Sequence, residues 1–452
     1  MGTRASAALG LALGAVTAAF YFMGSGRSLD YDSSLTVGAF VKTGWILDPL
    51  RRQIQLNNHP LFSVLEHIVW SAGLHTETYL RVLPIAAAAL TVALLTAWCA
   101  HFWGFVPGVS AGAVLATNPM FADLSRGVRG YSLLAFCALT STLLMWRLLS
   151  PVPTHRAVAV LYVLFLAAGI STHLYGCTVV VVHLAVVVAR RRLDSTWVAR
   201  WLGGGFLGGL IYLKTSNIVL HTQNTRVFHR EFGREVALSI LGQARVAAAA
   251  LAIVVVVALW LARRRTEFVS GVAVIVAFGL FVWIVLQPQF LVVRYWVWII
   301  PGVGLAAAFL VSRHPAAIAL VVVAVAAMAL HERPTWTTVQ NPTSETAALV
   351  DAARAQGMHV CGFRHTGVAV LAYTAQPKKA TTFEELAQCD LVVGFYVPGM
   401  IDRLERGVFA YSWKIPGQFP AFVYSRTPRA TLAAATPRRR EDLDTHPRTY
   451  PK

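Results

Sequence analysis

Apolar segments recur through the first 330 residues of the chain, and they constrain its fold more than any other feature. A helix that crosses a bilayer perpendicularly needs about 20 apolar residues, and several segments here are somewhat shorter. Together they predict a polytopic α-helical membrane protein with about eleven transmembrane helices. The candidate spans lie near 6–23, 83–103, 105–121, 131–149, 156–171, 174–189, 198–216, 244–262, 267–286, 292–312 and 316–330.

The composition supports this interpretation. Charged residues make up 13% of the 452 residues and hydrophobic residues 56%, whereas a soluble chain carries about 25% charged residues. Mean hydropathy is +0.58. These values exclude a soluble enzyme, a disordered protein, a coiled coil and a disulfide-rich secreted module. The net charge of +18 comes from basic residues beside apolar segments, which is typical of membrane orientation signals, so we expect no nucleic-acid partner.

Basic residues also predict how the chain is oriented. Arginine triplets at 190–192 and 263–265 follow the sixth and eighth spans, and such clusters face the cytoplasm. Arg4, Arg147 and Arg313 agree with this parity. We therefore expect a multi-pass protein of a bacterial plasma membrane, with a cytoplasmic N-terminus and an uncleaved first span. The loop at 24–82 and everything after residue 331 face outward in this arrangement.

The composition changes after the last span. Residues 331–426 predict a small extracytoplasmic α/β domain, with a helix at "ETAALVDAARAQG" closed by Gly357 and a second helix at "TFEELAQ". Short strands are expected at "MHVCGFR", "CDLVVGFYV" and "PAFVYSR". Cys361 and Cys389 open two of these strands, so they are expected either to form a disulfide or to be two buried thiols. The basic tail at 427–452 is expected to be disordered.

Two carboxylates stand close together in the first outer loop. Asp30 and Asp32 occur in "SLDYDSSLTVGAFV", and eight of the ten acidic residues before position 331 fall on or near the outer side. A positioned carboxylate accepts a proton from a hydroxyl nucleophile. The alternative is a solvated loop, or a helix N-cap formed by Asp32 or Ser33.

The same loop ends in a predicted amphipathic helix. His59 precedes Pro60, a residue that favours the first position of a helix. His59 and Glu66 are either functional residues at the outer surface or ordinary residues of an interfacial helix. The expected apolar stripe consists of Leu61, Leu65, Ile68 and Val69.

Arg126 and Arg129 lie on the outer side against the orientation trend, where the alternative to a functional role is pairing with Asp123 or with lipid headgroups. Arg129 and Arg294 stand at the starts of apolar spans, and a guanidinium there is suited to bind a phosphate. Tyr131, Tyr175 and Tyr295 lie at similar depth, where a membrane-interface aromatic belt would explain them. Such a belt does not explain Arg294.

The ordered set of motifs over residues 25–300 resembles the GT-C glycosyltransferases that use polyprenyl-phosphate sugars, the group of protein O-mannosyltransferases and aminoarabinose transferases. That group has motifs of the types "YDE", "HPPLY", "ARxYxL", "THY" and "RY". This chain departs from the first motif, because Ser33 replaces the second acidic residue and Asp30 is an additional acid. The matching stretches are Tyr31-Asp32-Ser33, His59-Pro60-Leu61-Phe62, Val128-Arg129-Gly130-Tyr131, Thr172-His173-Leu174-Tyr175 and Arg294-Tyr295.

The resemblance implies that residues 1–330 form a GT-C-like catalytic module. Asp32 would deprotonate the acceptor hydroxyl, with Asp30 as rival or helper. The sugar would be inverted, and Arg294 or Arg129 would offset the charge on the departing polyprenyl phosphate. The acceptor is a glycan, a lipid or a protein, and membrane lipids surround the module. The remaining substrate-binding candidates are His59, Tyr131, His173, Tyr175 and Tyr295.

No cofactor or nucleotide is implied, and no metal ligands are assigned, although a divalent metal requirement stays open. The main alternative is a transporter or lipid flippase that catalyses no glycosyl transfer. Transporters carry their sites near the bilayer midplane, often between internal repeats. Here the polar residues gather at one face, which favours the transferase.

The predicted orientation is testable with topology reporters. A periplasm-active reporter fused after residue 340 should be active, because the arginine clusters place everything after the last span outside. A cytoplasm-active reporter at the same position should be silent. Activity of the cytoplasmic reporter alone would contradict both the topology and the location of the site.

Overall fold

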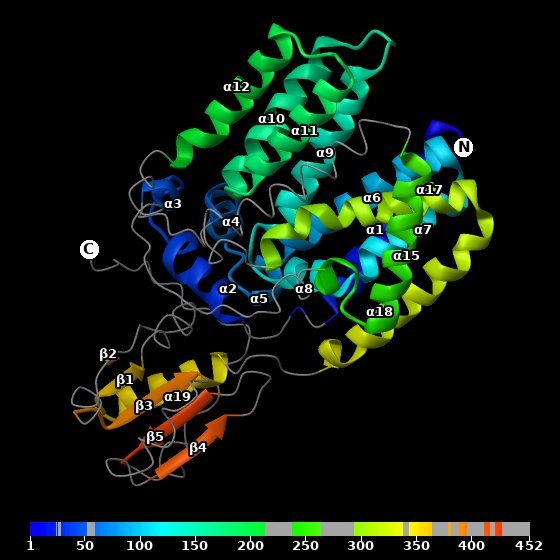
Figure 1. The fold of residues 1–452 in the computed structure, drawn as a ribbon. Coiled ribbons are helices and arrows are strands. Elements are labelled where there is room, and N and C mark those ends of the chain that lie inside the picture. Colours follow the sequence, from blue (N-terminus) through cyan, green and yellow to red (C-terminus); the bar gives the residue numbers. More distant parts are fainter. Residues whose placement is uncertain are drawn as a thin grey trace, which may run out of the picture.

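A helical bundle with a small sheet at one end makes up the computed structural model of the chain (Figure 1). It describes residues 1–23, 25, 29–51, 59–212, 237–263, 293–337, 343–363, 378–380, 388–395, 411–415 and 421–426. The bundle helices are α1 (Thr3–Phe22), α6 (Val82–Trp103), α7 (Phe105–Thr117), α8 (Pro119–Arg126), α9 (Tyr131–Leu149), α10 (Arg156–Thr172), α11 (Gly176–Ala189), α12 (Ser195–Gly209), α15 (Arg245–Ala262), α17 (Ile300–Arg313) and α18 (Ile318–Thr337).

Ten of the eleven predicted spans overlap these helices, and the ninth, at 267–286, lies outside the described residues. Among the described helices, five are long and apolar enough to cross a membrane, or six if α7 and α8 form one span bent by 60°. Helices α10 and α11 are apolar but shorter. The polytopic α-helical membrane fold is therefore confirmed.

Helix α6 lies between α1 and α7, and small residues bring the three helices together. Gly10 and Gly14 are one turn apart on α1 and face Ala89 and Ala93 of α6; a Cβ added at Gly14 would lie 2.8 Å from the Ala89 carbonyl oxygen. On α7, Gly112 approaches α6 in the same way. Small residues four apart are typical of close helix packing in membranes, so bulkier side chains here would separate the helices.

Short helices cover one end of the bundle. They are α2 (Tyr31–Thr36), the π-helix η1 (Val37–Val41), α3 (Asp48–Arg51), α4 (Pro60–Ser71) and α5 (Glu77–Leu80). One hydrophobic cluster joins them to the bundle and to the C-terminal region. Its buried members are Leu29, Val37, Val41, Phe62, Trp70, Leu80, Val128 and Ala347.

Helix α4 begins at Pro60 as predicted, and the expected apolar stripe lies outside its buried face, as in the interfacial helix that the sequence predicted. The buried face carries Ser63, Glu66 and His67, and His67 Nδ1 lies 2.8 Å from the Val41 carbonyl oxygen. Ile68, from the expected apolar stripe, is 49% exposed. The polar face is thus turned toward the protein, as in a helix whose apolar side meets lipid rather than core.

A five-stranded sheet follows the last bundle helix in sequence. Its strands are β1 (Val360–Phe363), β2 (Lys378–Ala380), β3 (Leu391–Phe395), β4 (Tyr411–Ile415) and β5 (Ala421–Ser425), in the order β2-β1-β3-β5-β4. Strand β1 pairs in parallel with β2 and β3, and β5 pairs antiparallel with β3 and β4. The three predicted strands are confirmed, while β2 and β4 were not foreseen. This is a small α/β unit.

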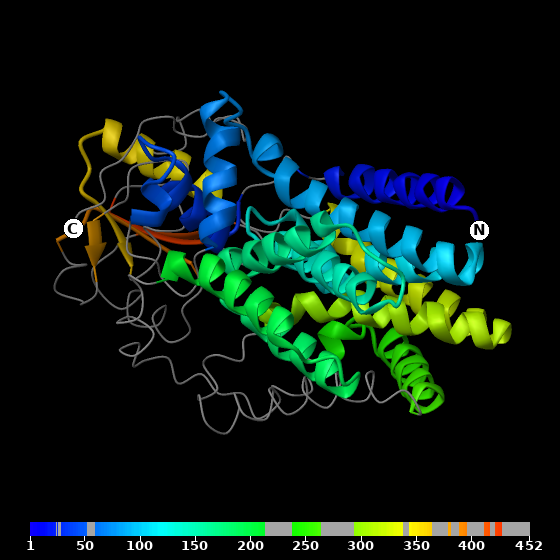
Figure 2. The ribbon, with the colours of Figure 1, turned by 90° about the horizontal axis from the view of Figure 1, so that it is seen from above.

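Helix α19 (Thr343–Ala355) connects the α/β unit to the bundle. It ends before Gly357, whose φ of +76° suits glycine, as the sequence predicted. The Thr343 hydroxyl donates to the Leu29 carbonyl. Figure 2 shows the sheet at the end of the bundle opposite the N-terminus. The second predicted helix, at "TFEELAQ", and the tail at 427–452 lie outside the described residues.

Cys361 and Cys389 form a disulfide, as predicted. Exchanging both for alanine should lower the free energy of unfolding of the α/β unit. The two residues are 28 positions apart, and a loop of this size gives about 3–4 kcal/mol of unfolded-state entropy. Thermal unfolding of the full chain, with and without reductant, measures the effect. Two alkylated thiols in the non-reduced protein would contradict the disulfide.

Candidate active site

Asp30 and Asp32 have different local surroundings. Asp30 is the N-cap of α2: its carboxylate accepts from the Ser33 backbone N–H at 2.6 Å and from the Ser33 hydroxyl at 3.1 Å. The Ser33 hydroxyl oxygen in turn accepts from the Val128 N–H at 2.9 Å. The expectation that Asp32 or Ser33 would be the N-cap was therefore wrong. Because Asp30 fixes the start of the helix, Asp32 is left to interact with other parts of the chain.

Asp32 lies between the two arginines that the sequence singled out. Its Oδ2 is 2.5 Å from Arg294 Nη1, and its Oδ1 is 3.4 Å from Arg129 Nη1. The Arg129 side chain is 3% exposed, Asp32 19% and Arg294 34%. Arg129 also donates from Nη2 to His59 Nε2 at 3.1 Å. These side chains form an ion cluster with one fully buried and one accessible guanidinium.

Backbone geometry explains how these residues meet. Gly130 stands just before α9, and a Cβ there would lie 2.7 Å from Thr172 Cγ2 and 3.1 Å from His59 Cβ. Glycine thus lets the turn carrying Arg129 press against the ends of α4 and α10. Arg294 belongs to the 3₁₀ helix η4 (Val293–Ile299), which leads into α17.

Aromatic side chains form a wall beside the ion cluster. The rings of His59 and Tyr131 lie 4.6 Å apart between centroids, and those of His59 and His173 5.0 Å apart. Tyr295 lies 4.6 Å from His173 and 4.9 Å from Tyr175. Eight of the nine predicted site residues therefore gather in one place, and the ninth, Asp30, caps the helix next to them.

Both histidines of the wall are neutral at physiological pH. Burial, together with Arg129 and Arg294, lowers the pKa of His173 to about 3, and burial and Arg129 lower the pKa of His59 well below its usual value. A guanidinium only donates, so His59 Nε2 accepts and its proton lies on Nδ1. His173 Nδ1 accepts from the Tyr175 N–H at 3.1 Å, which leaves the proton on Nε2.

Three buried polar atoms of the wall have no hydrogen-bond partner within the described part of the chain. They are His173 Nε2, Tyr131 Oη and Thr172 Oγ1. Buried polar groups are nearly always satisfied in native proteins. Either ordered water or a polar ligand would satisfy them. Thr172 belongs to a motif but was not singled out from the sequence.

Sequence reasoning also underrated Glu66. Its side chain is fully buried on α4, burial raises the pKa of its carboxyl well above the usual value, and neither oxygen has a partner among the residues described. The available signal was its position, because Ser63, Glu66 and His67 share one polar helix face.

A metal centre is not evident in the described regions. One group of three potential metal ligands lies close together, namely His359, Cys361 and Cys389. The two cysteines of this group are joined in the disulfide, so they are not free ligands. The group lies in the α/β unit and not beside Asp32.

The fold and the clustered site are those of a polytopic helical membrane protein with a polar site at one end of the bundle. Its structure is similar to crystal structures of ArnT from Cupriavidus metallidurans. The apo state of ArnT matches with a TM-score of 0.58 and 12% identity, covering 93% of this chain and 98% of that chain. ArnT bound to undecaprenyl phosphate matches with a TM-score of 0.58 and 14% identity, covering 92% and 98%. No protein-family model and no curated protein matches the sequence. At this identity the similarity establishes the shared fold.

The neutral state of the buried histidines predicts how stability depends on pH. The folded-state pKa of His173 is about 3, below an unfolded value of about 6.5. The contribution of His173 to the free energy of unfolding is therefore complete above pH 6.5. It is lost as the pH falls, by up to about 1.4 kcal/mol per pH unit. Between pH 7 and pH 5, the melting temperature of His173→Gln should therefore fall less than that of the wild type. Equal losses would contradict a neutral, buried His173.

Proposed function

We propose that the chain is an integral membrane glycosyltransferase. It transfers a sugar from a polyprenyl-phosphate donor to an acceptor hydroxyl at the extracytoplasmic face of a bacterial plasma membrane. In this proposal residues 1–330 are the catalytic module, with residues 331–426 as an outer domain. The observation that carries the proposal is the Asp32 carboxylate held between Arg129 and Arg294. The fold shared with ArnT, of which one structure holds undecaprenyl phosphate, supports the choice of donor.

The position of the cluster suits a lipid-linked donor. Asp32, Arg129 and Arg294 lie at the end of the bundle where α9 and α17 begin, next to the short helices α2 and α4. A polyprenyl tail would stay in the bilayer while its phosphate reaches this end. Guanidinium groups bind phosphate through paired N–H donors. The donor is already activated, so the reaction needs no nucleotide.

The transfer is a single displacement. The acceptor oxygen attacks the anomeric carbon as the bond from that carbon to the phosphate oxygen breaks, so the configuration inverts. The hydroxyl proton moves to Asp32, and the electron pair of the broken bond leaves with polyprenyl phosphate. The arginines stabilise the charge that develops on the departing phosphate, an effect that is large in a site that excludes water.

The two arginines differ in exposure, and this suggests different roles. Arg129 is held between Asp32 and His59 in a buried position, so it fixes the carboxylate. Arg294 is one-third exposed and is the guanidinium that an incoming phosphate reaches. When the phosphate draws Arg294 away, Asp32 loses a counter-charge, and a carboxylate with fewer positive neighbours accepts a proton more readily.

The orphaned groups of the aromatic wall are suited to bind a sugar. His173 Nε2–H donates, and Tyr131 Oη and Thr172 Oγ1 each donate or accept. Sugar hydroxyls are both donors and acceptors, and sugar ring faces pack on aromatic rings. We assign His59, Tyr131, His173, Tyr175 and Tyr295 to substrate binding on this basis.

The role of Asp32 is tested by Asp32→Asn. A strain that lacks the protein should lose a sugar from its envelope glycans or lipids, and mass analysis of these fractions identifies the product. Purified Asp32→Asn should then transfer label from the corresponding lipid-linked sugar about 10² to 10⁴ times more slowly, the usual contribution of a general base. Asp48→Asn is the matched control, because Asp48 lies on α3 and its carboxylate caps the Trp45 N–H.

More than about a tenth of wild-type activity in Asp32→Asn, a barrier change below about 1.4 kcal/mol, would show that Asp32 is not the base. Asp30→Asn should be mild, because asparagine caps helices as well as aspartate does. If Asp30→Asn were the inactive variant, the base would be Asp30. Label that crosses the membrane without any transfer to an acceptor would favour a flippase.

Arg294→Ala separates donor binding from the proton transfer. A phosphate is present before and after the reaction, so this variant should bind the donor more weakly and also turn over more slowly. The thermal stabilisation that added undecaprenyl phosphate gives the purified protein measures binding. Asp32→Asn should keep most of this stabilisation and Arg294→Ala should lose it. Equal stabilisation of the two variants would show that Arg294 does not bind the donor phosphate.

A further inference from the structure

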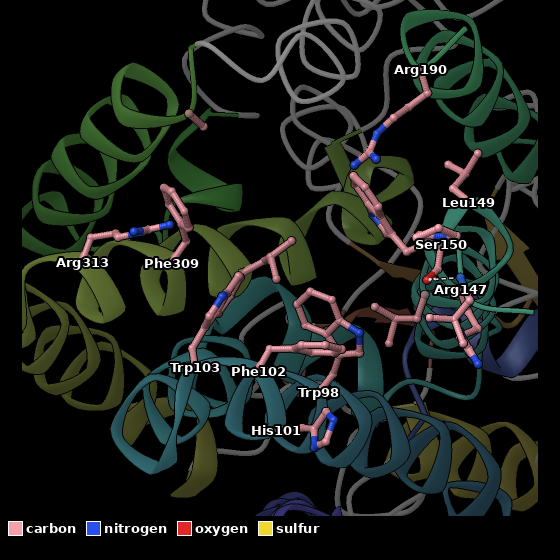
Figure 3. Close-up of a pocket in the computed structure, with 16 residues that line it drawn as sticks. Trp98, His101, Phe102, Trp103, Arg147, Leu149, Ser150, Arg190, Phe309 and Arg313 are labelled. Carbon is pink, nitrogen blue, oxygen red and sulfur yellow. Dashed lines mark hydrogen bonds between the residues drawn. The ribbon is translucent and has the colours of Figure 1, made fainter. Parts of the chain in front are cut away.

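A hollow lies at the other end of the bundle from the candidate active site. It has a volume of about 730 Å³ and lies where α6, α9, α11, α15 and α17 end (Figure 3). Helix α9 begins beside the ion cluster at Tyr131 and ends in the hollow at Leu149. Nineteen residues at about 1.5 Å each correspond to about 28 Å, which is close to the thickness of the hydrocarbon core. The two sites thus belong to opposite faces of the membrane.

Three arginines line this hollow from three different helices. Arg147 comes from the last turn of α9, Arg190 caps α11 and Arg313 ends α17. None of the described residues that line the hollow is Asp or Glu. The described lining thus contains three basic and no acidic side chains, contributed by segments that only the folded bundle brings together.

Aromatic rings hold two of these arginines at the hollow. The Arg190 guanidinium lies 4.9 Å from the centre of the Trp146 ring, and that of Arg313 lies 5.8 Å from the centre of the Phe309 ring. Such cation–π contacts restrain a guanidinium at modest energetic gain. Figure 3 shows Arg190 extending from its helix toward the hollow and Arg313 beside Phe309.

Apart from His101 and Ser150, the remaining wall is apolar, and it extends below the membrane surface. Trp98 lies five residues before the end of α6, and Leu143 lies six residues before the end of α9. At about 1.5 Å per residue, these two residues lie about 8–9 Å along the helix axis from the helix ends. Val152, at the outer edge, is 54% exposed, so the hollow opens to the surroundings. A cavity with a basic rim and an apolar interior matches an amphiphile with an anionic head and a hydrocarbon body.

We propose that this hollow binds the phosphate headgroup of an anionic membrane phospholipid. The arginines contact the phosphate, and the tryptophan and leucine side chains contact the first part of the acyl chains. Basic pockets between transmembrane helices are a recognised form of lipid binding. The volume exceeds what inorganic phosphate would fill, and the apolar walls would give a free anion no contact. The site is independent of the glycosyl transfer at the opposite face.

Native mass spectrometry of the purified full chain tests the proposal. The probes are phosphatidylglycerol, phosphatidylcholine and inorganic phosphate. Wild-type protein should retain phosphatidylglycerol in preference to phosphatidylcholine. Arg147→Gln combined with Arg190→Gln should bind phosphatidylglycerol about thirtyfold more weakly, which corresponds to about 1 kcal/mol for each arginine. Arg156→Gln combined with Arg200→Gln removes the same charge from the same end of the bundle, outside the hollow, and should retain the lipid.

Two results would overturn the proposal. One is equal retention of phosphatidylglycerol by the two double variants, which would make the effect one of general charge. The other is full displacement of the lipid by inorganic phosphate, which would indicate a free-anion site. If the first double variant does not fold, Val152→Trp narrows the opening while keeping every arginine. It should also reduce retention of phosphatidylglycerol, and unchanged retention in that variant would contradict lipid entry into the hollow.

Discussion

The carboxylate of Asp32 holds together parts of the chain that lie far apart in sequence. Its partner Arg294 is 262 residues away, and its other partner, Arg129, is almost completely buried. Asp32 supplies a counter-charge for the buried Arg129 guanidinium, and this ion pair joins the α8–α9 turn to α2. The position of Asp32 depends in turn on Asp30 and Ser33, which fix the start of α2 and tie it to Val128.

The bilayer explains why the charges gather at two ends. Charges at membrane depth are costly and need pairing, so a spanning helix carries them where it begins and where it ends. The segment made of η4 and α17 carries Arg294 at the ion cluster and ends with Arg313 at the hollow. Between the ends, α6 supplies the small residues against which α1 and α7 pack. The packed apolar helices thus separate the ion cluster at one end of the bundle from the hollow at the other.

The sequence predicted the spans well because hydropathy depends on composition alone. It did not distinguish the roles of Asp30 and Asp32, since two acids two apart face the same way in a strand and differently in a helix. In the structure Asp30 is the N-cap of α2, and Asp32 faces the two arginines. The apolar stripe marked α4 as an interfacial helix, but it did not show that Glu66 on the other face is fully buried. The hollow lined by Arg190 and Arg313 depends on tertiary contacts, so no local sequence pattern predicts it.

Charge balance links the two arginines to the proposed base. The ion cluster of Arg129, Arg294 and Asp32 has a net charge of plus one, and the neighbouring histidines add none, because burial lowers the pKa of both His59 and His173. A sugar polyprenyl phosphate is a phosphodiester with one negative charge, so the loaded cluster is neutral. Transfer gives a phosphomonoester with up to two negative charges. If Asp32 takes the acceptor proton in the same step, its own charge disappears and the cluster remains neutral. A base elsewhere would leave the departing phosphate and an ionised Asp32 facing the same two guanidiniums, which is why the proton is best received by this carboxylate.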